Sequence, residues 1–263
     1  MKYFQNRQNQ NSRHRIKTFD PTSLVNSRPQ ASSQEEKKYI PSNTFYGFGL
    51  TKALSDNIAL RNYSNLTPIQ DQVIPLLLSG RDVVGIANTG TGKTVSFLIP
   101  FIQKAMSDKS QQTLILAPTR ELATQIDQEF RSFSRNTGLY SALCIGGVSM
   151  KGQIRSLRYN PNFVIGTPGR IADLWQQRYV NFSIFNNVVL DEVDRILDMG
   201  FIHDITQILS ALSKKRQSAF FSATLPPEVS RVMTSFLNSP INVSVRANTT
   251  LDNISQEIVK TNG

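Results

Sequence analysis

The sequence predicts an α/β fold, with a mostly parallel β-sheet that is covered by helices on both faces. Two patterns lead to this prediction. Short apolar runs of strand length recur along the chain, at 83–86, 113–117, 141–145, 163–166, 188–190, 219–221 and 243–245. Segments with apolar residues at helical spacing lie between several of these runs. Strands that alternate with helices favour a parallel sheet, because each helix carries the chain back to the edge from which the strand began.

The N-terminal segment, residues 1–41, is expected to be a disordered basic extension. It is rich in Gln, Asn, Ser and Arg and has few apolar residues to offset the entropy of ordering. The first 40 residues hold eight basic and three acidic side chains, which is a net charge of +5 out of +10 for the chain. Such a tail either holds nucleic acid loosely or only keeps the chain soluble, and both interpretations stay open.

The first strand leads into a candidate phosphate-binding loop. The run 83–86 is followed by a glycine-rich stretch and then by a helix with Phe97, Phe101, Ile102 and Met106 at its apolar positions. A strand, a glycine-rich turn and a helix N-terminus in this order are the context that a phosphate-binding loop requires. The loop consists of Ala87, Asn88, Thr89, Gly90, Thr91, Gly92, Lys93 and Thr94.

Two side chains of this loop have predicted roles toward a nucleotide. We expect Lys93 to reach the outer phosphates and the Thr94 hydroxyl to bind magnesium. Ala87 stands where such loops usually begin with glycine, and its small side chain still allows the turn to close. The alternative interpretation is a plain Gly-Thr turn beside a solvated lysine.

The middle of the chain supplies two further strand–helix pairs. Their helices have apolar faces that comprise Leu122, Ile126, Phe130 and Phe133 after the run 113–117, and Ile171, Leu174 and Trp175 after the run 163–166. Trp175 has an aromatic face that suits a nucleic-acid base, but its helical spacing with Ile171 predicts core packing.

The run 188–190 ends in an acidic tetrapeptide, Asp191-Glu192-Val193-Asp194. Carboxylates at the C-terminal end of a strand are a recurring way to hold magnesium beside a nucleotide. Phosphoryl transfer needs charge neutralisation and a positioned nucleophile at one place, and two adjacent carboxylates supply both. Alone, the tetrapeptide also fits a solvated acidic turn, but together with the loop it predicts a nucleotide site.

Composition limits the class of protein. A chain of 263 residues is long enough for one large α/β domain or two small ones, and its pI near 9.9 suits a polyanionic partner. No run approaches the roughly 18 apolar residues of a membrane span, and the N-terminus lacks the apolar core of a secretory signal. We therefore expect a soluble, cytoplasmic chain with no membrane partner, in which the single Cys144 is buried and forms no disulfide.

The motifs together resemble a known family. From the N-terminus, the series is Phe45, then 63–70 (YSNLTPIQ), the loop ending GKT at 92–94, 118–122 (PTREL), 146–147 (GG), 167–170 (TPGR), 191–194 (DEVD) and 222–224 (SAT). In this order, from Phe45 to about Val245, they resemble the first RecA-like domain of DEAD-box ATP-dependent RNA helicases. The resemblance implies a RecA-like P-loop NTPase domain at 42–245, with 246–263 as the interdomain linker and the start of a second domain.

The resemblance also implies an ATP site. Gln70, in the same motif as Thr67, would read the adenine edge, and Phe45 would stack on that base. Lys93, Asp191 and Glu192 would be the catalytic residues. Asp191 would bind Mg²⁺ together with Thr94, and Glu192 would act as general base or water-positioning group. For Gln70 the alternative interpretation is an amide on a helix surface.

An RNA-binding role follows from the same comparison. Arg120, Gly147, Thr167 and Arg170 match positions that contact RNA phosphates and sugars in the family, and such contacts are independent of base sequence. Asp194, Ser222 and Thr224 match the link between the ATP site and the RNA grip. Each of these roles has an alternative. Arg120 could form an ion pair at a helix start, and Arg170 could be a solvated charge. Ser222 and Thr224 could be ordinary turn hydroxyls.

The sequence departs from the family pattern at several places. Val193 replaces the usual alanine of the tetrapeptide, while Asn62 and Leu66 replace a glycine and a proline near the glutamine motif. The second RecA-like domain, with the arginines that complete the ATP site, is not recognisable. We therefore expect this chain to bind ATP and Mg²⁺ but to hydrolyse ATP poorly and not to unwind duplexes alone. A non-catalytic regulator that binds ATP or RNA is the alternative function, and the glutamine motif with 118–122 disfavours a DNA-directed helicase.

Overall fold

The structure is a computed structural model that describes residues 39–245 of the chain. Its centre is a seven-stranded sheet in which all six strand pairings are parallel, in the order β3-β4-β2-β5-β6-β1-β7. The strands are β1 (Val83–Ala87), β2 (Thr113–Leu116), β3 (Ser141–Cys144), β4 (Phe163–Gly166), β5 (Asn187–Leu190), β6 (Gln217–Ser222) and β7 (Ile241–Val245). The predicted parallel sheet is confirmed.

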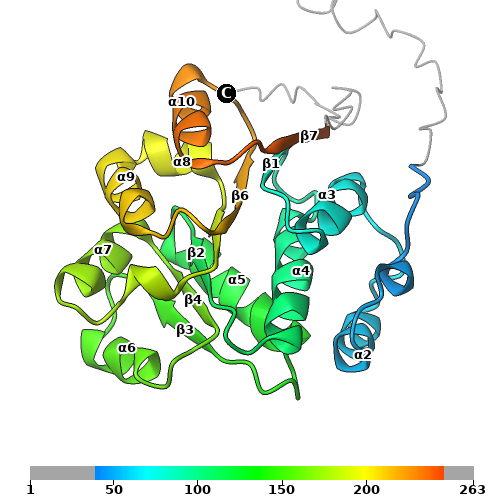
Figure 1. Ribbon diagram of the computed structural model, residues 1–263, viewed down its shortest axis with the longest axis horizontal. Coiled ribbons are helices and arrows are strands. Elements are labelled where there is room, and N and C mark those ends of the chain that lie inside the picture. The colour runs from blue at the N-terminus through cyan, green and yellow to red at the C-terminus, as the bar shows by residue number, and fades with distance from the viewer. Residues whose placement is uncertain (1–38, 246–263) are drawn as a thin grey trace, which may run out of the picture. The chain divides into compact units, whose positions relative to one another are not determined.

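Helices cover both faces of the sheet, as Figure 1 shows with α3 and α4 on one side and α8, α9 and α10 on the other. The first group comprises the 3₁₀ helix η1 (Phe45–Phe48), α2 (Lys52–Leu60), α3 (Pro68–Leu78), α4 (Lys93–Ser107) and α5 (Arg120–Phe133). The second group comprises α6 (Met150–Leu157), α7 (Pro168–Gln176), η2 (Phe182–Ile184), α8 (Val193–Asp198), α9 (Ile202–Ala211) and α10 (Pro227–Phe236).

Two hydrophobic cores lie on opposite sides of the sheet because side chains alternate along each strand. On β6, Phe220 packs with the α8–α10 side and Phe221 with the α3–α5 side. On β5, Val188 and Val189 divide in the same way. Strands buried on both faces need continuous apolar runs, which is why these runs were visible in the sequence.

Two predictions about single core residues are confirmed. Trp175 is partly buried in the second core, where it stacks on Phe182 with ring centroids 5.2 Å apart. Cys144 is buried and free, and burial raises the pKa of its thiol to about 12.

The N-terminal boundary is corrected by three residues. Most of the predicted disordered extension, residues 1–38 of 1–41, lies outside the described residues. The predicted linker at 246–263 lies outside them as well. Residues 39–41, however, belong to the described fold, because the Tyr39 hydroxyl donates to Asp71 Oδ2 at 2.5 Å. Composition could not reveal this anchor, since its partner lies 32 residues further along the chain. Within the described range, none of the helices combines the length and the apolar character of a membrane span.

Candidate nucleotide-binding site

The phosphate-binding loop joins the C-terminal end of β1 to the first turn of α4. Gly90 and Gly92 have φ angles of 83° and 93°, which side chains with a Cβ rarely adopt. Ala87 is the last residue of β1 and has no positive φ, so its methyl group is accommodated and the turn closes without a glycine there. The side chains of Asn88 and Thr89 are exposed.

Lys93 is the first residue of α4 and points back into the loop. Its side chain is only 6% exposed, and its Nζ donates a hydrogen bond to the Ala87 carbonyl oxygen at 2.9 Å. The alternative of a solvated lysine is therefore wrong. A buried ammonium at a helix N-terminus gives this loop a strong preference for anions.

Asp191 follows β5 and is 2% exposed. Burial raises the pKa of its carboxyl to about 6 and Glu192 adds to the rise, while the positive charge of Lys93 opposes it. The Glu192 backbone N–H donates to Asp191 Oδ1 at 3.0 Å. A buried carboxylate that is this costly to ionise is stabilised when a cation lies beside it.

Glu192 connects the acidic strand end to the phosphate-binding loop. Thr89 Oγ1 donates to its Oε1 at 3.4 Å, and Arg195 Nη1 donates to its Oε2 at 3.3 Å. Its backbone is left-handed, with φ 51° and ψ 56°, although it is not a glycine. Such strain costs about 1–3 kcal/mol and clusters at functional sites.

The donor set around the loop fits a magnesium ion that takes part of its ligands from waters and phosphates. It does not fit a metal whose ligands all come from the protein. Within residues 39–245, no group of three or more His, Cys, Asp or Glu side chains is arranged to hold a metal ion. Mg²⁺ typically takes one or two carboxylates, and fills its other positions with waters and substrate phosphates. Asp191 is such a carboxylate, and the half-buried Thr94 is the second residue of α4 beside Lys93.

Gln70 is buried and is tied to the same loop. Its Oε1 accepts from the Thr67 backbone N–H at 3.0 Å, and its Nε2 donates to the Gly92 carbonyl oxygen at 3.2 Å. With 1% of its surface exposed, it is not an amide on a helix surface, so that alternative is wrong. Adenine recognition by Gln70 stays a prediction, but its amide links the 67–70 turn to the phosphate-binding loop.

Phe45 is buried in the first core, where its ring meets Tyr63 edge-on at 6.2 Å. Only 4% of the residue is exposed, so stacking on a base requires this ring to shift, and that role stays a prediction. The segment just before it, residues 39–44, is held by Asp71, which follows Gln70 directly. We call residues 39–44 the strap.

Asp71 was missed by the sequence analysis. Besides the Tyr39 hydroxyl, its carboxylate accepts the backbone N–H of Ser42 at 2.8 Å and both the backbone N–H and the side-chain amide of Asn43, at 3.0 and 2.8 Å. Burial opposes ionisation, but these hydrogen bonds hold the pKa of Asp71 below its usual value. No local pattern marks this residue, because its partners lie 28 to 32 positions away.

The three predicted coupling residues are in contact. Asp194 Oδ2 accepts from the Thr224 backbone N–H and from Thr224 Oγ1, both at 2.9 Å, and Ser222 Oγ accepts from the Asp194 backbone N–H at 3.2 Å. Burial opposes ionisation of the Asp194 carboxyl, but the hydrogen bonds from Thr224 hold its pKa below the usual value. The end of β6 and the residue Thr224 are thus tied to the acidic tetrapeptide, and their role in coupling stays a prediction.

Three of the four predicted RNA-contact residues meet at the loop 146–149, which contains Gly147 and is contacted by Arg120 and Arg170. Arg120 Nη1 donates to the Gly146 carbonyl oxygen and Arg170 Nη1 to the Val148 carbonyl oxygen, both at 3.4 Å. Gly147 has a φ of 76°, and a Cβ there would lie 2.0 Å from Arg120 Nη1. Thr167 precedes α7 and is buried. The side chain of Arg170 is 13% exposed, which excludes a fully solvated charge.

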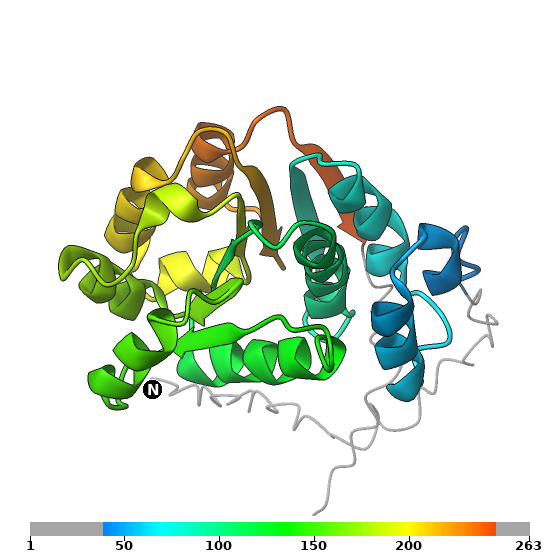
Figure 2. The same ribbon diagram turned by 60° about the horizontal axis from the view of Figure 1, so that its bottom comes forward.

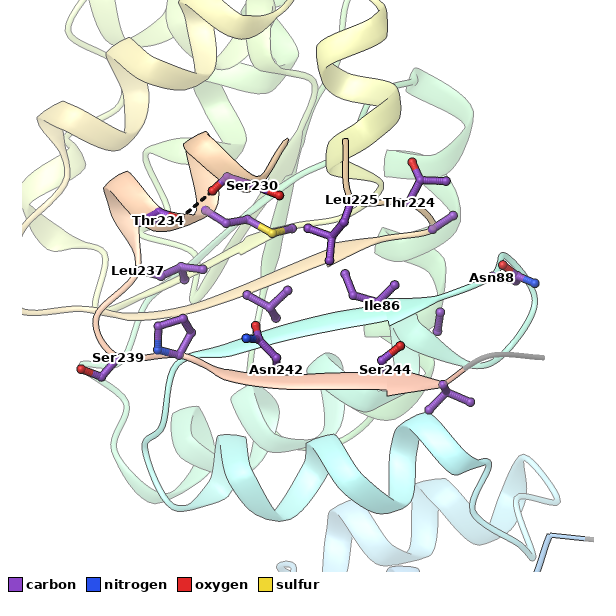
Figure 3. A pocket seen from close by; sticks show the side chains of 16 residues that line it. Ile86, Asn88, Thr224, Leu225, Ser230, Thr234, Leu237, Ser239, Asn242 and Ser244 are labelled. Carbon is purple, nitrogen blue, oxygen red and sulfur yellow. Dashed lines mark hydrogen bonds between the residues drawn. The ribbon is translucent and has the colours of Figure 1, made fainter. Parts of the chain in front are cut away.

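A pocket of about 770 Å³ lies beside this site, on the sheet face under α10. Figure 3 shows Ile86 on β1 and Asn242 and Ser244 on β7 pointing toward Leu225. The pocket shares Asn88 and Thr224 with the candidate site, but no charged side chain lines it. Phosphates need cationic or N–H donors, so the loop around Lys93 is the better nucleotide site.

Comparison with known proteins agrees with this geometry. The family model "DEAD/DEAH box helicase" matches residues 67–232, which is more than half of the chain. The chain is 41% identical over 215 residues to the DEAD-box ATP-dependent RNA helicase CshA of Bacillus subtilis, covering 81% of this chain and 44% of that protein. It is 41% identical over 204 residues to the RNA helicase CrhR of Synechocystis, covering 78% of this chain and 42% of that protein.

A solved structure has the same fold. A DEAD box protein from the hyperthermophile Methanococcus jannaschii superposes with a TM-score of 0.74 and 36% identity, covering 77% of this chain and 56% of that one. The chain spans less than half the length of the curated relatives named above. With the family's sequence model, its relatives and its fold in agreement, the chain belongs to the DEAD/DEAH box helicase family.

Proposed function

We propose that this chain is the ATP-binding part of an ATP-dependent RNA helicase, which couples ATP binding and hydrolysis to RNA binding and local duplex unwinding. The observation that carries the proposal is the contact between Thr89 of the phosphate-binding loop and Glu192 of the acidic tetrapeptide. It brings a buried lysine, a buried carboxylate and a strained glutamate to one place at the C-terminal edge of the sheet, where α/β proteins bind nucleotides.

Each side chain has a separate part in this proposal. Lys93 and the N–H groups of the loop hold the phosphates, and Asp191 with Thr94 holds Mg²⁺. The ion neutralises charge on the phosphates when it is bound. Glu192 orients the attacking water and accepts its proton, because its carboxylate already lies against the loop. Arg195, which donates to Glu192, fixes the orientation of that carboxylate.

The RNA contacts are assigned to the loop at 146–149 with Arg120, Thr167 and Arg170. Coupling to the ATP site is assigned to Asp194 with Ser222 and Thr224, because these contacts join the acidic tetrapeptide to the end of the neighbouring strand β6. We expect a shift of the tetrapeptide on ATP binding to move Ser222 and Thr224 through these contacts of Asp194.

The test is RNA-stimulated ATP hydrolysis by this chain and by a chimera that adds the C-terminal half of the Bacillus subtilis relative. We expect the chain alone to bind a fluorescent ATP analogue with slow turnover, and the chimera to hydrolyse ATP faster when RNA is added. Binding without turnover in either protein would support the non-catalytic regulator instead. Failure of the chain to bind the analogue would contradict the proposed function and would leave only a regulator that binds RNA.

The strap gives a prediction about nucleotide affinity. Replacing Asp71 with alanine removes the acceptor for four donors from the strap, and hydrogen bonds to a charged group contribute about 1.5–3 kcal/mol each. We expect residues 39–44 to loosen and Phe45 to lose its fixed position. Affinity for the ATP analogue should fall about tenfold, which corresponds to about 1.4 kcal/mol.

A matched control for this variant is Asp56→Ala on α2, which removes an exposed carboxylate paired only with Lys52. Its ATP affinity should equal that of the parent chain. Asp71→Asn, which keeps one acceptor oxygen, should lie between the two. An Asp71→Ala chain with full affinity would show that the strap does not contribute to nucleotide binding.

A further inference from the structure

A groove lined by three arginines lies between α2 and the C-terminal end of α5. It has a volume of about 390 Å³, and its lining includes Arg61, Arg131 and Arg135 but neither aspartate nor glutamate. None of the motifs discussed above uses these arginines. Figure 2 shows α5 running along the lower side of the molecule toward α2.

The groove has a rigid floor. The Asn57 side chain on α2 donates to the backbone carbonyl oxygens of Phe133 and Arg135, at 2.8 and 2.9 Å, and so fixes α2 to the end of α5. The Arg61 guanidinium lies over the Phe133 ring, 5.5 Å from its centroid. Arg61 and Arg135 are exposed, and 63% of the Arg131 side chain is exposed although it pairs with Asp127.

The arginine groove adjoins a second groove, which lies at the proposed RNA-contact loop and is lined by both Arg120 and Glu121. The second groove is more open and has a volume of about 430 Å³, and Gln128 lines both grooves. Arg120, Thr124, Gln128 and Arg131 follow one face of α5 at steps of four, four and three residues. At 1.5 Å per residue, this face extends over about 16 Å from Arg120 to Arg131.

The charge pattern of the sequence agrees with a polyanionic occupant. Between Glu129 and Asp173 the chain contains no acidic residue, whereas Arg131 and Arg135 line the groove and Arg170 reaches the contact loop. Two acids lie behind the groove without lining it. Asp127 is buried against Arg131 and Ser141, and burial raises the pKa of Glu129.

We propose that the arginine groove is a second RNA subsite, which holds the phosphates of the strand that leaves the contact loop near Arg120. Guanidinium groups bind phosphate with planar, paired hydrogen bonds. Contacts of this kind do not depend on the base sequence of the RNA. The inference rests on the proposed RNA function, because the strand enters the groove from that loop. The subsite lengthens the RNA footprint along α5 without adding base specificity.

The test compares two single-stranded RNAs, of about 5 and about 12 nucleotides, lengths within the range that single-strand binding folds cover. Binding to the full chain is followed by fluorescence anisotropy at several salt concentrations. The variant Arg61→Gln/Arg135→Gln removes two groove charges and spares Arg131, which is needed by the buried Asp127. Thermal unfolding verifies that each variant is folded.

We expect the parent chain to bind the longer RNA more tightly, and the double variant to lose about tenfold in affinity for it. The slope of log affinity against log salt should fall by about 1.4, since each lost single-strand contact removes about 0.7. Affinity for the short RNA should not change. Arg61→Lys/Arg135→Lys, which keeps both charges, should restore most of the salt slope.

The matched control is Lys214→Gln/Lys215→Gln, which removes two exposed charges between α9 and β6 on the other face of the sheet. It should leave the binding of both RNAs unchanged. If the groove variant binds the long RNA normally but no longer binds polyglutamate, the groove takes an acidic polypeptide and the RNA subsite is wrong. If the parent chain binds neither RNA, the proposed function fails instead of the subsite.

Discussion

Replacing Glu192 with glutamine is expected to leave ATP bound and to slow its hydrolysis by about 10²–10⁴-fold, the usual contribution of a positioned general base. The glutamine has nearly the same shape and still offers an oxygen to Thr89, which lies 3.4 Å from Glu192 Oε1. It cannot accept a proton from water at neutral pH. The variant therefore keeps the contact of residue 192 with the phosphate-binding loop and removes only its capacity to activate the attacking water.

The measurement is single-turnover ATP hydrolysis in the chimera with the C-terminal half of the Bacillus subtilis relative, beside titration with a fluorescent ATP analogue. Affinity should stay within about threefold of the parent, because the lost charge does not hold the phosphates. Glu228→Gln changes an exposed acid in the first turn of α10 in the same way and should have no effect. Normal turnover in the Glu192→Gln chimera would show that Glu192 is not the general base.

The backbone of Glu192 adds a reason to expect a large effect. A non-glycine residue in the left-handed region persists only where its surroundings hold it, and here the Thr89 and Arg195 contacts and the burial of the neighbouring Asp191 do so. The tetrapeptide predicted the carboxylate but not this conformation. A residue's φ angle depends on what packs around it, and that information is not local in the sequence.

The sheet was predictable because the signals for its strands are local. Phe220 and Phe221 enter opposite cores, so both positions had to be apolar, and a continuous apolar run is visible without knowledge of the neighbours. The strand order was not predicted. It depends on which strands pair, and β1 lies between β6 and β7, the last two strands in the sequence.

The site residues that belong to sequence motifs could be predicted. Contacts between segments that lie far apart in the sequence could not. Lys93, Asp191 and Glu192 belong to motifs, and the structure brings all three together. Asp71 belongs to no motif, and its role depends on a strap whose first three residues, 39–41, composition had assigned to a disordered tail. The Gln70 contact with the Gly92 carbonyl oxygen was missed for the same reason, since it joins residues 22 positions apart.

The second large effect is expected from Lys93→Ala, which should weaken binding of the ATP analogue by at least about 100-fold. Lys93 donates to the Ala87 carbonyl oxygen at 2.9 Å and supplies the positive charge that favours ionised Asp191. Removal of the lysine leaves the phosphates without their buried cation. A charge-assisted hydrogen bond contributes about 1.5–3 kcal/mol, and the weaker hold on Mg²⁺ at Asp191 adds to that loss.

Two controls make the result specific to the loop. Lys109→Ala removes a lysine of the same charge that is exposed and donates only to the Thr137 carbonyl oxygen, so its affinity should equal that of the parent. Lys93→Arg keeps the charge but places a longer, planar group in a position that is 6% exposed, and we expect it to bind the analogue weakly as well. Unchanged affinity in Lys93→Ala, with normal thermal unfolding, would mean that the nucleotide binds elsewhere. The uncharged pocket under α10 would then be the next site to test, because it has a volume of about 770 Å³ and shares Asn88 with the loop.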